Sequence, residues 1–165
     1  MHEAVRRALD DQIAHEFGSA YFYLAASAYF ESLNLAGFAR WMRLQAQEEV
    51  GHGMKLFDFM NDRGARPSLR ALEQPTGDFA SPVDAFQHSL ENEQRVSESI
   101  HRLYDLAVQH HDHPTQVLLQ WFITEQVEEE KSATQMFEEL RLAGDNPTAL
   151  LLLNAEAGRR EAEAE

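Results

Sequence analysis

The chain has 165 residues and no cysteine, and 44% of its residues are hydrophobic. We expect one domain, residues 1–165, and the lack of cysteine excludes disulfides, thiol catalysis and Cys-ligated metal clusters. The formal net charge of −14 repels phosphate backbones, so a nucleic-acid partner is not expected. No run of about 18 apolar residues and no signal-peptide pattern occurs, so we expect a cytoplasmic protein with no membrane partner.

The first two predicted elements are long amphipathic helices. Their seam positions, which are mostly hydrophobic, recur at alternating intervals of three and four residues, as in a helix bundle. The first helix runs from about Val5 to Leu33, and Asn34 ends it. The second begins near Leu35 and stops before Gly64, which lies just past its end.

The segment 65–82 carries three prolines and shows no sustained helical period. It is too long for a tight turn between helices, so we expect it to cross over along the length of the bundle. A third helix begins at the favourable pair Ser81-Pro82 and ends near His110.

Proline marks the start of both remaining helices. Pro114 opens a fourth helix that Gly144 terminates, and Pro147 opens a short fifth helix that continues through Leu153. The charged segment 158–165 is expected to fray. The sequence therefore predicts an all-α protein with four long helices, a crossover between the second and third, and a short C-terminal helix.

Each long helix carries one carboxylate in the middle of its hydrophobic seam. These residues are Glu16, Glu49, Glu93 and Glu129, and His52 follows Glu49 by three residues on the same helix face. A buried carboxylate is costly and four together repel one another, so cations are needed to neutralise them. Two divalent ions would cancel the charge, and mixed Glu and His ligands suit iron, manganese or zinc. The pattern predicts a two-metal site inside the bundle.

Three segments carry a family resemblance. They are EFGSAYFY at 16–23, AQEEVGH at 46–52 and LQWFITEQVEEEK at 119–131, and they resemble ferritins, most of all the non-haem bacterial ferritins. The resemblance implies a ferritin-like bundle with ferroxidase activity, which oxidises Fe²⁺ with O₂ or H₂O₂. It also implies iron storage as Fe³⁺ mineral inside a homo-oligomeric cage of about 24 subunits.

The resemblance also assigns the iron ligands. One site is similar to Glu16, Glu49 and His52. The second is similar to Glu49, Glu93 and Glu129, with Glu49 bridging and Gln126 near the pair. No second histidine stands three residues after Glu129, so the two iron positions are expected to be unequal.

A third iron site is also implied by the resemblance. It would use Glu48, Glu125, Glu128 and Glu129. The alternative for the first three is a solvated acidic face.

Other residues near the expected iron sites have weaker assignments. Tyr23 is expected to be redox-active or to bond a carboxylate as a core tyrosine, and Trp121 is expected to pack. Haem-containing relatives have methionine directly after the bridging glutamate, where this chain has Val50, so no haem is expected. The turn that holds His110, His111 and His113 would line an iron entry channel in the family, and a solvated loop is the alternative.

Two other interpretations remain open. One is a di-iron oxidase or peroxidase of the rubrerythrin type, although those usually carry a Cys-ligated iron domain that this sequence lacks. The other is a small-shell DNA-protecting iron protein. Those build their iron site between subunits and many have a basic tail, whereas residues 161–165 are EAEAE.

Overall fold

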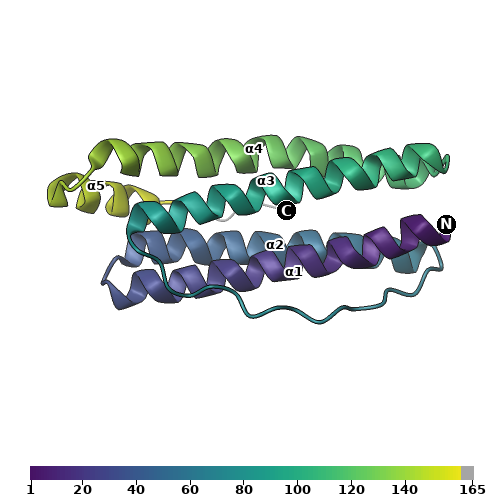
Figure 1. The fold of residues 1–165 in the computed structure, drawn as a ribbon, viewed down its shortest axis with the longest axis horizontal. Coiled ribbons are helices and arrows are strands. Elements are labelled where there is room, and N and C mark those ends of the chain that lie inside the picture. Colours follow the sequence, from purple (N-terminus) through teal and green to yellow (C-terminus); the bar gives the residue numbers. More distant parts are fainter. Residues whose placement is uncertain (161–165) are drawn as a thin grey trace.

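A computed structural model describes residues 1–160, and these form helices and connecting segments without any strand. The helices are α1 (Glu3–Ser32), α2 (Ala36–Asp62), α3 (Pro82–Gln109), α4 (His113–Ala143) and α5 (Pro147–Ala157). The predicted all-α bundle with a short fifth helix is therefore confirmed (Figure 1). In residues 1–160, every helix is too short or too polar to cross a membrane.

The bundle consists of two antiparallel hairpins, α1–α2 and α3–α4, joined by the crossover 65–81 that runs along its length (Figure 1). The hairpins meet most closely where α1 packs against α3. On the opposite side α2 and α4 are wider apart, and no Cα atoms of these two helices come within 8 Å of each other. Side chains therefore have to fill the space between α2 and α4.

Side-chain caps explain where the helices begin. Ser81 Oγ accepts a hydrogen bond from the backbone N–H of Asp84, as expected for the start of α3. The Asp112 carboxylate accepts one from the N–H of Thr115, so α4 starts one residue before the predicted Pro114. Gly144, with a φ of 54°, ends α4 in a conformation that favours glycine.

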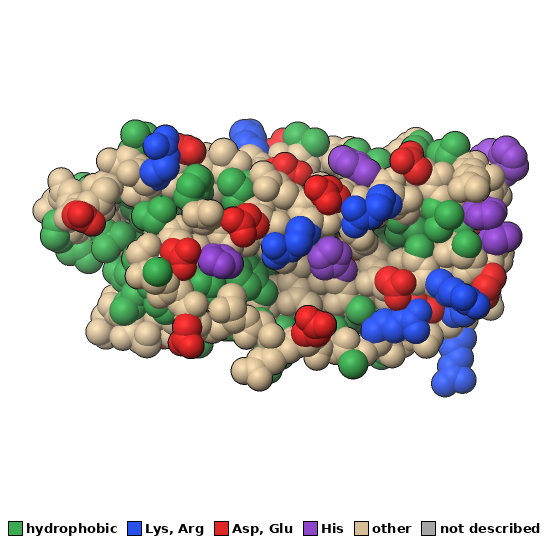
Figure 2. All heavy atoms as spheres, viewed as in Figure 1, with side chains coloured by type: hydrophobic (Ala, Val, Ile, Leu, Met, Phe, Trp, Pro, Cys, Tyr) green, Lys and Arg blue, Asp and Glu red, His purple; other side chains and the backbone are tan. Residues whose placement is uncertain are grey.

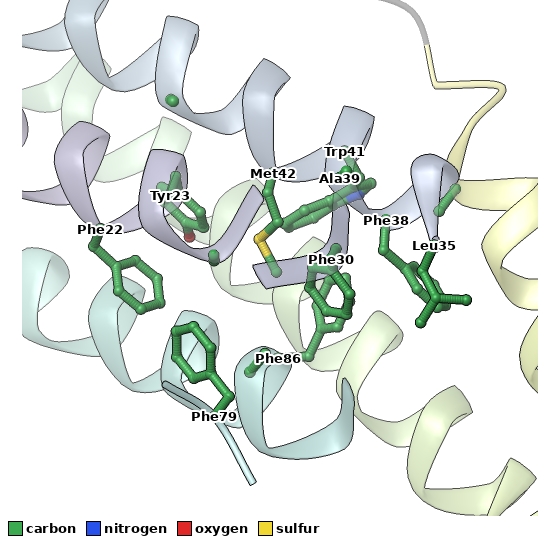
Figure 3. Packing of buried hydrophobic residues seen from close by; sticks show 14 of the residues in the cluster. Phe22, Tyr23, Phe30, Leu35, Phe38, Ala39, Trp41, Met42, Phe79 and Phe86 are labelled. Atoms are coloured by element: carbon green, nitrogen blue, oxygen red, sulfur yellow. The ribbon is translucent and has the colours of Figure 1, made fainter. Parts of the chain in front are cut away.

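The hydrophobic core has two parts separated by a polar layer. An aromatic cluster that includes Phe30, Phe38 and Phe86 fills the end of the bundle near α5 (Figure 3). An aliphatic cluster that includes Leu9 and Ile100 fills the other end. Along each long helix the seam glutamate lies between the residues of these two clusters, so the four glutamates share one layer.

The crossover is fixed to the outer side of α1. Asp10 Oδ1 accepts a hydrogen bond of 2.8 Å from the N–H of Ser68, and Asp11 pairs with Arg70 at 2.9 Å. Further along, the buried ring of Phe79 lies edge-on to Phe22 at a centroid distance of 6.1 Å (Figure 3). These contacts tie a segment without regular secondary structure to the bundle.

The fifth helix packs against the start of α2. A Cβ atom on Gly37 would lie 1.7 Å from the carbonyl oxygen of Asn154, so only glycine allows this approach. The side chain of Asn154 accepts a hydrogen bond from the N–H of Phe38 at 3.0 Å. From the end of the bundle α5 runs back toward its middle, and residues 158–160 continue in that direction (Figure 1).

Candidate metal centre

The first group of potential ligands lies between α1 and α2. Ligand atoms of Glu16, Glu49 and His52 lie within 4.8 Å of one another, and all three side chains are buried. Glu49 Oε2 is 3.5 Å from His52 Nδ1. The buried Oε2 atoms of Glu16 and Glu49 have no hydrogen-bond partner among residues 1–160. Buried carboxylate oxygens without donors are suited to a cation, and Glu with His suits iron.

Glu16 is held in place by its own helix and by α3. Its Oε1 atom accepts a hydrogen bond of 2.8 Å from Gln12 Nε2. The Oε1 atom of Gln12 in turn accepts a hydrogen bond from Ser99 on α3. One oxygen of Glu16 is thus oriented by protein donors, while the other faces the group of ligands.

Glu93 on α3 is oriented by two donors from other helices. The hydroxyl of Tyr23 on α1 donates to Oε1, and Gln126 on α4 donates from Nε2 to Oε2 at 3.3 Å. The hydroxyl oxygens of Tyr23 and Ser89 are 3.0 Å apart. Burial raises the pKa of Glu93 to about 7, although the hydrogen bonds from Tyr23 and Gln126 oppose the shift.

Glu129 on α4 completes the layer. Its Oε2 atom accepts a hydrogen bond of 2.8 Å from Gln45 Nε2 on α2. Burial, together with the charge of Glu93, raises the pKa of Glu129 to about 8. Burial and the charges of neighbouring glutamates raise the pKa of Glu49 well above its ordinary value. These carboxyl groups therefore carry protons near neutral pH unless cations replace those protons.

Three of the four residues predicted for a third iron site, Glu125, Glu128 and Glu129, line a cavity of about 260 Å³ next to this layer. The fourth, Glu48 on α2, is ion-paired with Arg160 at 2.7 Å. The grouping differs in detail from the predicted set, because ligand atoms of His52 lie within 4.8 Å of those of Glu125 and Glu129. Occupancy of a third site stays a prediction.

The chain is similar to known proteins over nearly its whole length. A family model for the ferritin-like domain matches residues 6–143. The chain belongs to the ferritin family. Its relatives include a bacterial non-heme ferritin of Staphylococcus aureus (strain USA300), 40% identical over 153 residues, or 93% of this chain and 92% of that protein. Another, from Bacteroides fragilis (strain 638R), is 35% identical over 159 residues, or 96% and 98% of the two chains.

Solved ferritin structures agree with this assignment over nearly the whole chain. An open-pore ferritin from the hyperthermophilic archaeon Archaeoglobus fulgidus is 46% identical, with a TM-score of 0.96 over 98% of this chain and 99% of that one. An engineered closed form of the same protein is 45% identical, with a TM-score of 0.97 over 99% of both chains. Membership of the ferritin family implies iron binding, and the Glu and His cluster has the chemistry for it.

Two residues of this ferritin stand out that the sequence did not single out as part of the site. Gln45 lies one helical turn before Glu49, so a polar residue at that seam position was the available signal. Nothing in the sequence pattern indicated that Arg160 lies near the site, because it belongs to the segment 158–165 that was expected to fray. That expectation is wrong for residues 158–160, since the contacts of Arg160 with α2 hold the chain there. The rest of the tail, 161–165, lies outside the described residues.

The remaining predicted residues lie around the site or far from it. Trp121 packs edge-on against His52 with ring centroids 5.5 Å apart, and Lys55 Nζ lies 4.0 Å from the centroid of the indole. Histidine side chains gather at the far end of the bundle, near the amino terminus and the α3–α4 turn (Figure 2). There His110 stacks on His2 at 3.7 Å. A role for that turn in iron entry stays a prediction.

Proposed function

We propose that this ferritin oxidises Fe²⁺ at a pair of sites inside each subunit and stores the product as Fe³⁺ mineral. The observation that carries the proposal is the pair of buried oxygens on Glu16 and Glu49 beside His52, which lack hydrogen-bond donors within residues 1–160. Glu93 and Glu129 complete the layer from the other hairpin. One iron position is formed by Glu16, Glu49 and His52, and the second by Glu49, Glu93 and Glu129.

The raised pKa values suggest how the layer accepts iron. Without metal, Glu93 and Glu129 have pKa values of about 7 and 8, so both hold protons for much of the time. Entry of Fe²⁺ displaces those protons, and the ionised carboxylates then favour the higher charge of Fe³⁺. Two Fe²⁺ ions each give up one electron, which reduces O₂ to H₂O₂ with two protons or H₂O₂ to two hydroxide ions. Tyr23 keeps Glu93 oriented through its hydroxyl.

Storage requires a closed assembly around the mineral. Family membership supports a homo-oligomer, and we propose a cage of about 24 identical subunits. The exposed leucines 151 and 152 of α5, 59% and 67% exposed in the single chain, are suited to a contact between subunits. An assembly of this size is directly measurable by size-exclusion chromatography with light scattering.

The iron chemistry is tested by adding Fe²⁺ aerobically and following the absorbance of Fe³⁺. We expect Glu49→Ala and His52→Ala to slow the initial rate at least about tenfold, because each removes a ligand of the first iron position. Glu98→Ala is the matched control, since Glu98 is exposed on α3 and outside the layer. Equal rates in all four proteins would refute the site.

The stoichiometry separates storage from a di-iron oxidase or peroxidase. A store continues to take up iron far beyond two or three ions per subunit and keeps it with the protein during gel filtration. Uptake that stops at the occupancy of the internal sites would support the rubrerythrin-type alternative. A small assembly of about a dozen subunits would instead support the small-shell alternative.

A further inference from the structure

The side chain of Arg160 reaches from the C-terminal tail to residues beside the polar layer. Its Nη2 atom donates to Glu48 Oε2 at 2.7 Å, and its Nη1 atom donates to Gln45 Oε1. The guanidinium also lies over the ring of Trp41, 4.9 Å from the centroid. Its side chain is only 19% exposed. Three separate contacts thus hold one partly buried cation, a far more specific arrangement than a surface ion pair.

The position of Arg160 coincides with that of the predicted third iron site. Arg160 lines the same cavity of about 260 Å³ as Glu125, Glu128 and Glu129, and it pairs with Glu48. The cavity residues come from α4 and Glu48 comes from α2, the two helices whose Cα atoms stay more than 8 Å apart. The guanidinium is therefore bound to α2 and lines the cavity on the side where α2 and α4 are wider apart.

We propose that the guanidinium of Arg160 occupies the predicted third iron site, and that a metal ion binds there only when the guanidinium moves away. This inference rests on the proposed function, because it assigns the surrounding glutamates to iron handling. A guanidinium does not lose its proton in proteins, so its charge is permanent. An arriving divalent ion is repelled by that charge, and it competes with the guanidinium for the Glu48 carboxylate.

The same contact orients a ligand of the paired site. Gln45 presents its carbonyl oxygen to Arg160 and its amide nitrogen to Glu129. The reverse orientation would set the amide N–H groups against the guanidinium and leave Glu129 without a donor, so Arg160 fixes the amide. Arg160 is in this respect a positioning residue for Glu129. Its departure frees Gln45 to rotate and changes the donor set of that carboxylate.

The direct test is calorimetric titration with Zn²⁺, a redox-inert ion that accepts Glu and His ligands. The full-length wild type is compared with Arg160→Ala. Arg159→Ala is the matched control, because Arg159 is its exposed neighbour on the same tail. We expect Arg159→Ala to match the wild type, and we expect Arg160→Ala alone to bind a further ion beyond the pair at least about tenfold more tightly. Equal affinity for the further ion in all three would overturn the proposal.

Glu49→Ala separates this inference from the proposed function. Pair binding that survives Glu49→Ala overturns the proposed iron pair. If Glu49→Ala removes pair binding but Arg160→Ala leaves the affinity for the further ion unchanged, only the proposed role of Arg160 is overturned. Arg160→Lys keeps a positive charge but loses the planar two-donor geometry, and its affinity for the further ion should fall between those of the wild type and the alanine variant.

A second readout follows the departure of the guanidinium itself. Trp41 and Trp121 are the two tryptophans of the chain, so a Trp121→Phe background leaves Trp41 as the sole indole. We expect Zn²⁺ beyond the first pair to change Trp41 fluorescence when Arg160 is present and to leave it unchanged in Arg160→Ala. Third-ion binding without any fluorescence change in the Arg160 protein would show that the guanidinium stays, which contradicts the proposal.

Discussion

At the scale of single residues, the buried carboxyl group of Glu93 makes the stability of the protein depend on pH. Its pKa rises from 4.5 to about 7 on folding because the carboxyl is buried, so the folded metal-free protein binds a proton that the unfolded chain releases. The stabilisation from this proton is complete below pH 4.5 and is lost as the pH rises through 7. This loss lowers the free energy of unfolding by about 3 kcal/mol.

We therefore expect the melting temperature of the metal-free protein to fall between pH 5 and pH 8, and to fall less in Glu93→Gln. Glutamine has the shape of the protonated acid but does not titrate. Differential scanning calorimetry at the two pH values measures this, with Glu98→Gln as the exposed control on the same helix. A pH dependence in Glu93→Gln equal to that of the wild type would contradict the assignment of the proton.

The sequence predicted which polar residues share the layer better than it predicted what surrounds them. Glu16, Glu49 and His52 are recognisable because a polar residue at a seam position of an amphipathic helix must face the interior of the bundle. Arg160 could not be predicted, because its partners Gln45 and Glu48 lie more than a hundred positions earlier and helical periodicity carries no information over such a separation.

At the scale of elements, the crossover depends on one buried aspartate. Asp10 is 1% exposed and accepts hydrogen bonds from Ser68 and Arg6, whereas its neighbour Asp11 is exposed and pairs with Arg70. We expect Asp10→Ala to cost about 1–3 kcal/mol, because it removes a buried carboxylate that accepts hydrogen bonds from the Ser68 N–H and the Arg6 guanidinium. Asp11→Ala should cost under about 0.5 kcal/mol. Calorimetric unfolding that gave equal losses for both variants would contradict this account of the crossover.

The placement of α5 depends on Gly37. Alanine there would put a methyl group 1.7 Å from the Asn154 carbonyl oxygen, so α5 must move away from α2 and carry Arg160 with it. We expect Gly37→Ala to lower the melting temperature and to increase amide exchange in α5, as measured by mass spectrometry. Gly18→Ala is the control, because its methyl group meets no atom within 4 Å and alanine favours the helix. Faster exchange in both variants, or in neither, would contradict the proposed close approach.

Helix ends were predicted less accurately than helices. The predicted fourth helix began at Pro114, yet the cap by Asp112 places His113 in α4. The fifth helix was expected through Leu153 and continues to Ala157, where its last turn packs against α2. Seam spacing fixes the middle of a helix, whereas its ends depend on local side-chain bonds and on distant packing.

At the scale of the whole molecule, we expect the exposed leucines of α5 to hold the assembly together. Leu152→Glu would place a charge in an apolar subunit contact, so the large assembly should give way to smaller species in light scattering. Circular dichroism checks that each subunit still folds. A particle of unchanged size would show that α5 is not part of a contact between subunits.

The polar layer has a consequence for the mechanics of the entire bundle. It divides the interior into an aromatic core near α5 and an aliphatic core at the opposite end, with no continuous apolar path between them at the level of the four glutamates. In the absence of metal, the two ends are joined mainly by helix backbones and a few hydrogen bonds. Each end can then loosen on its own, as a separate cooperative unit. Iron bound across all four helices would couple the two units. The subunit would then unfold in one step with iron bound and in two steps without it.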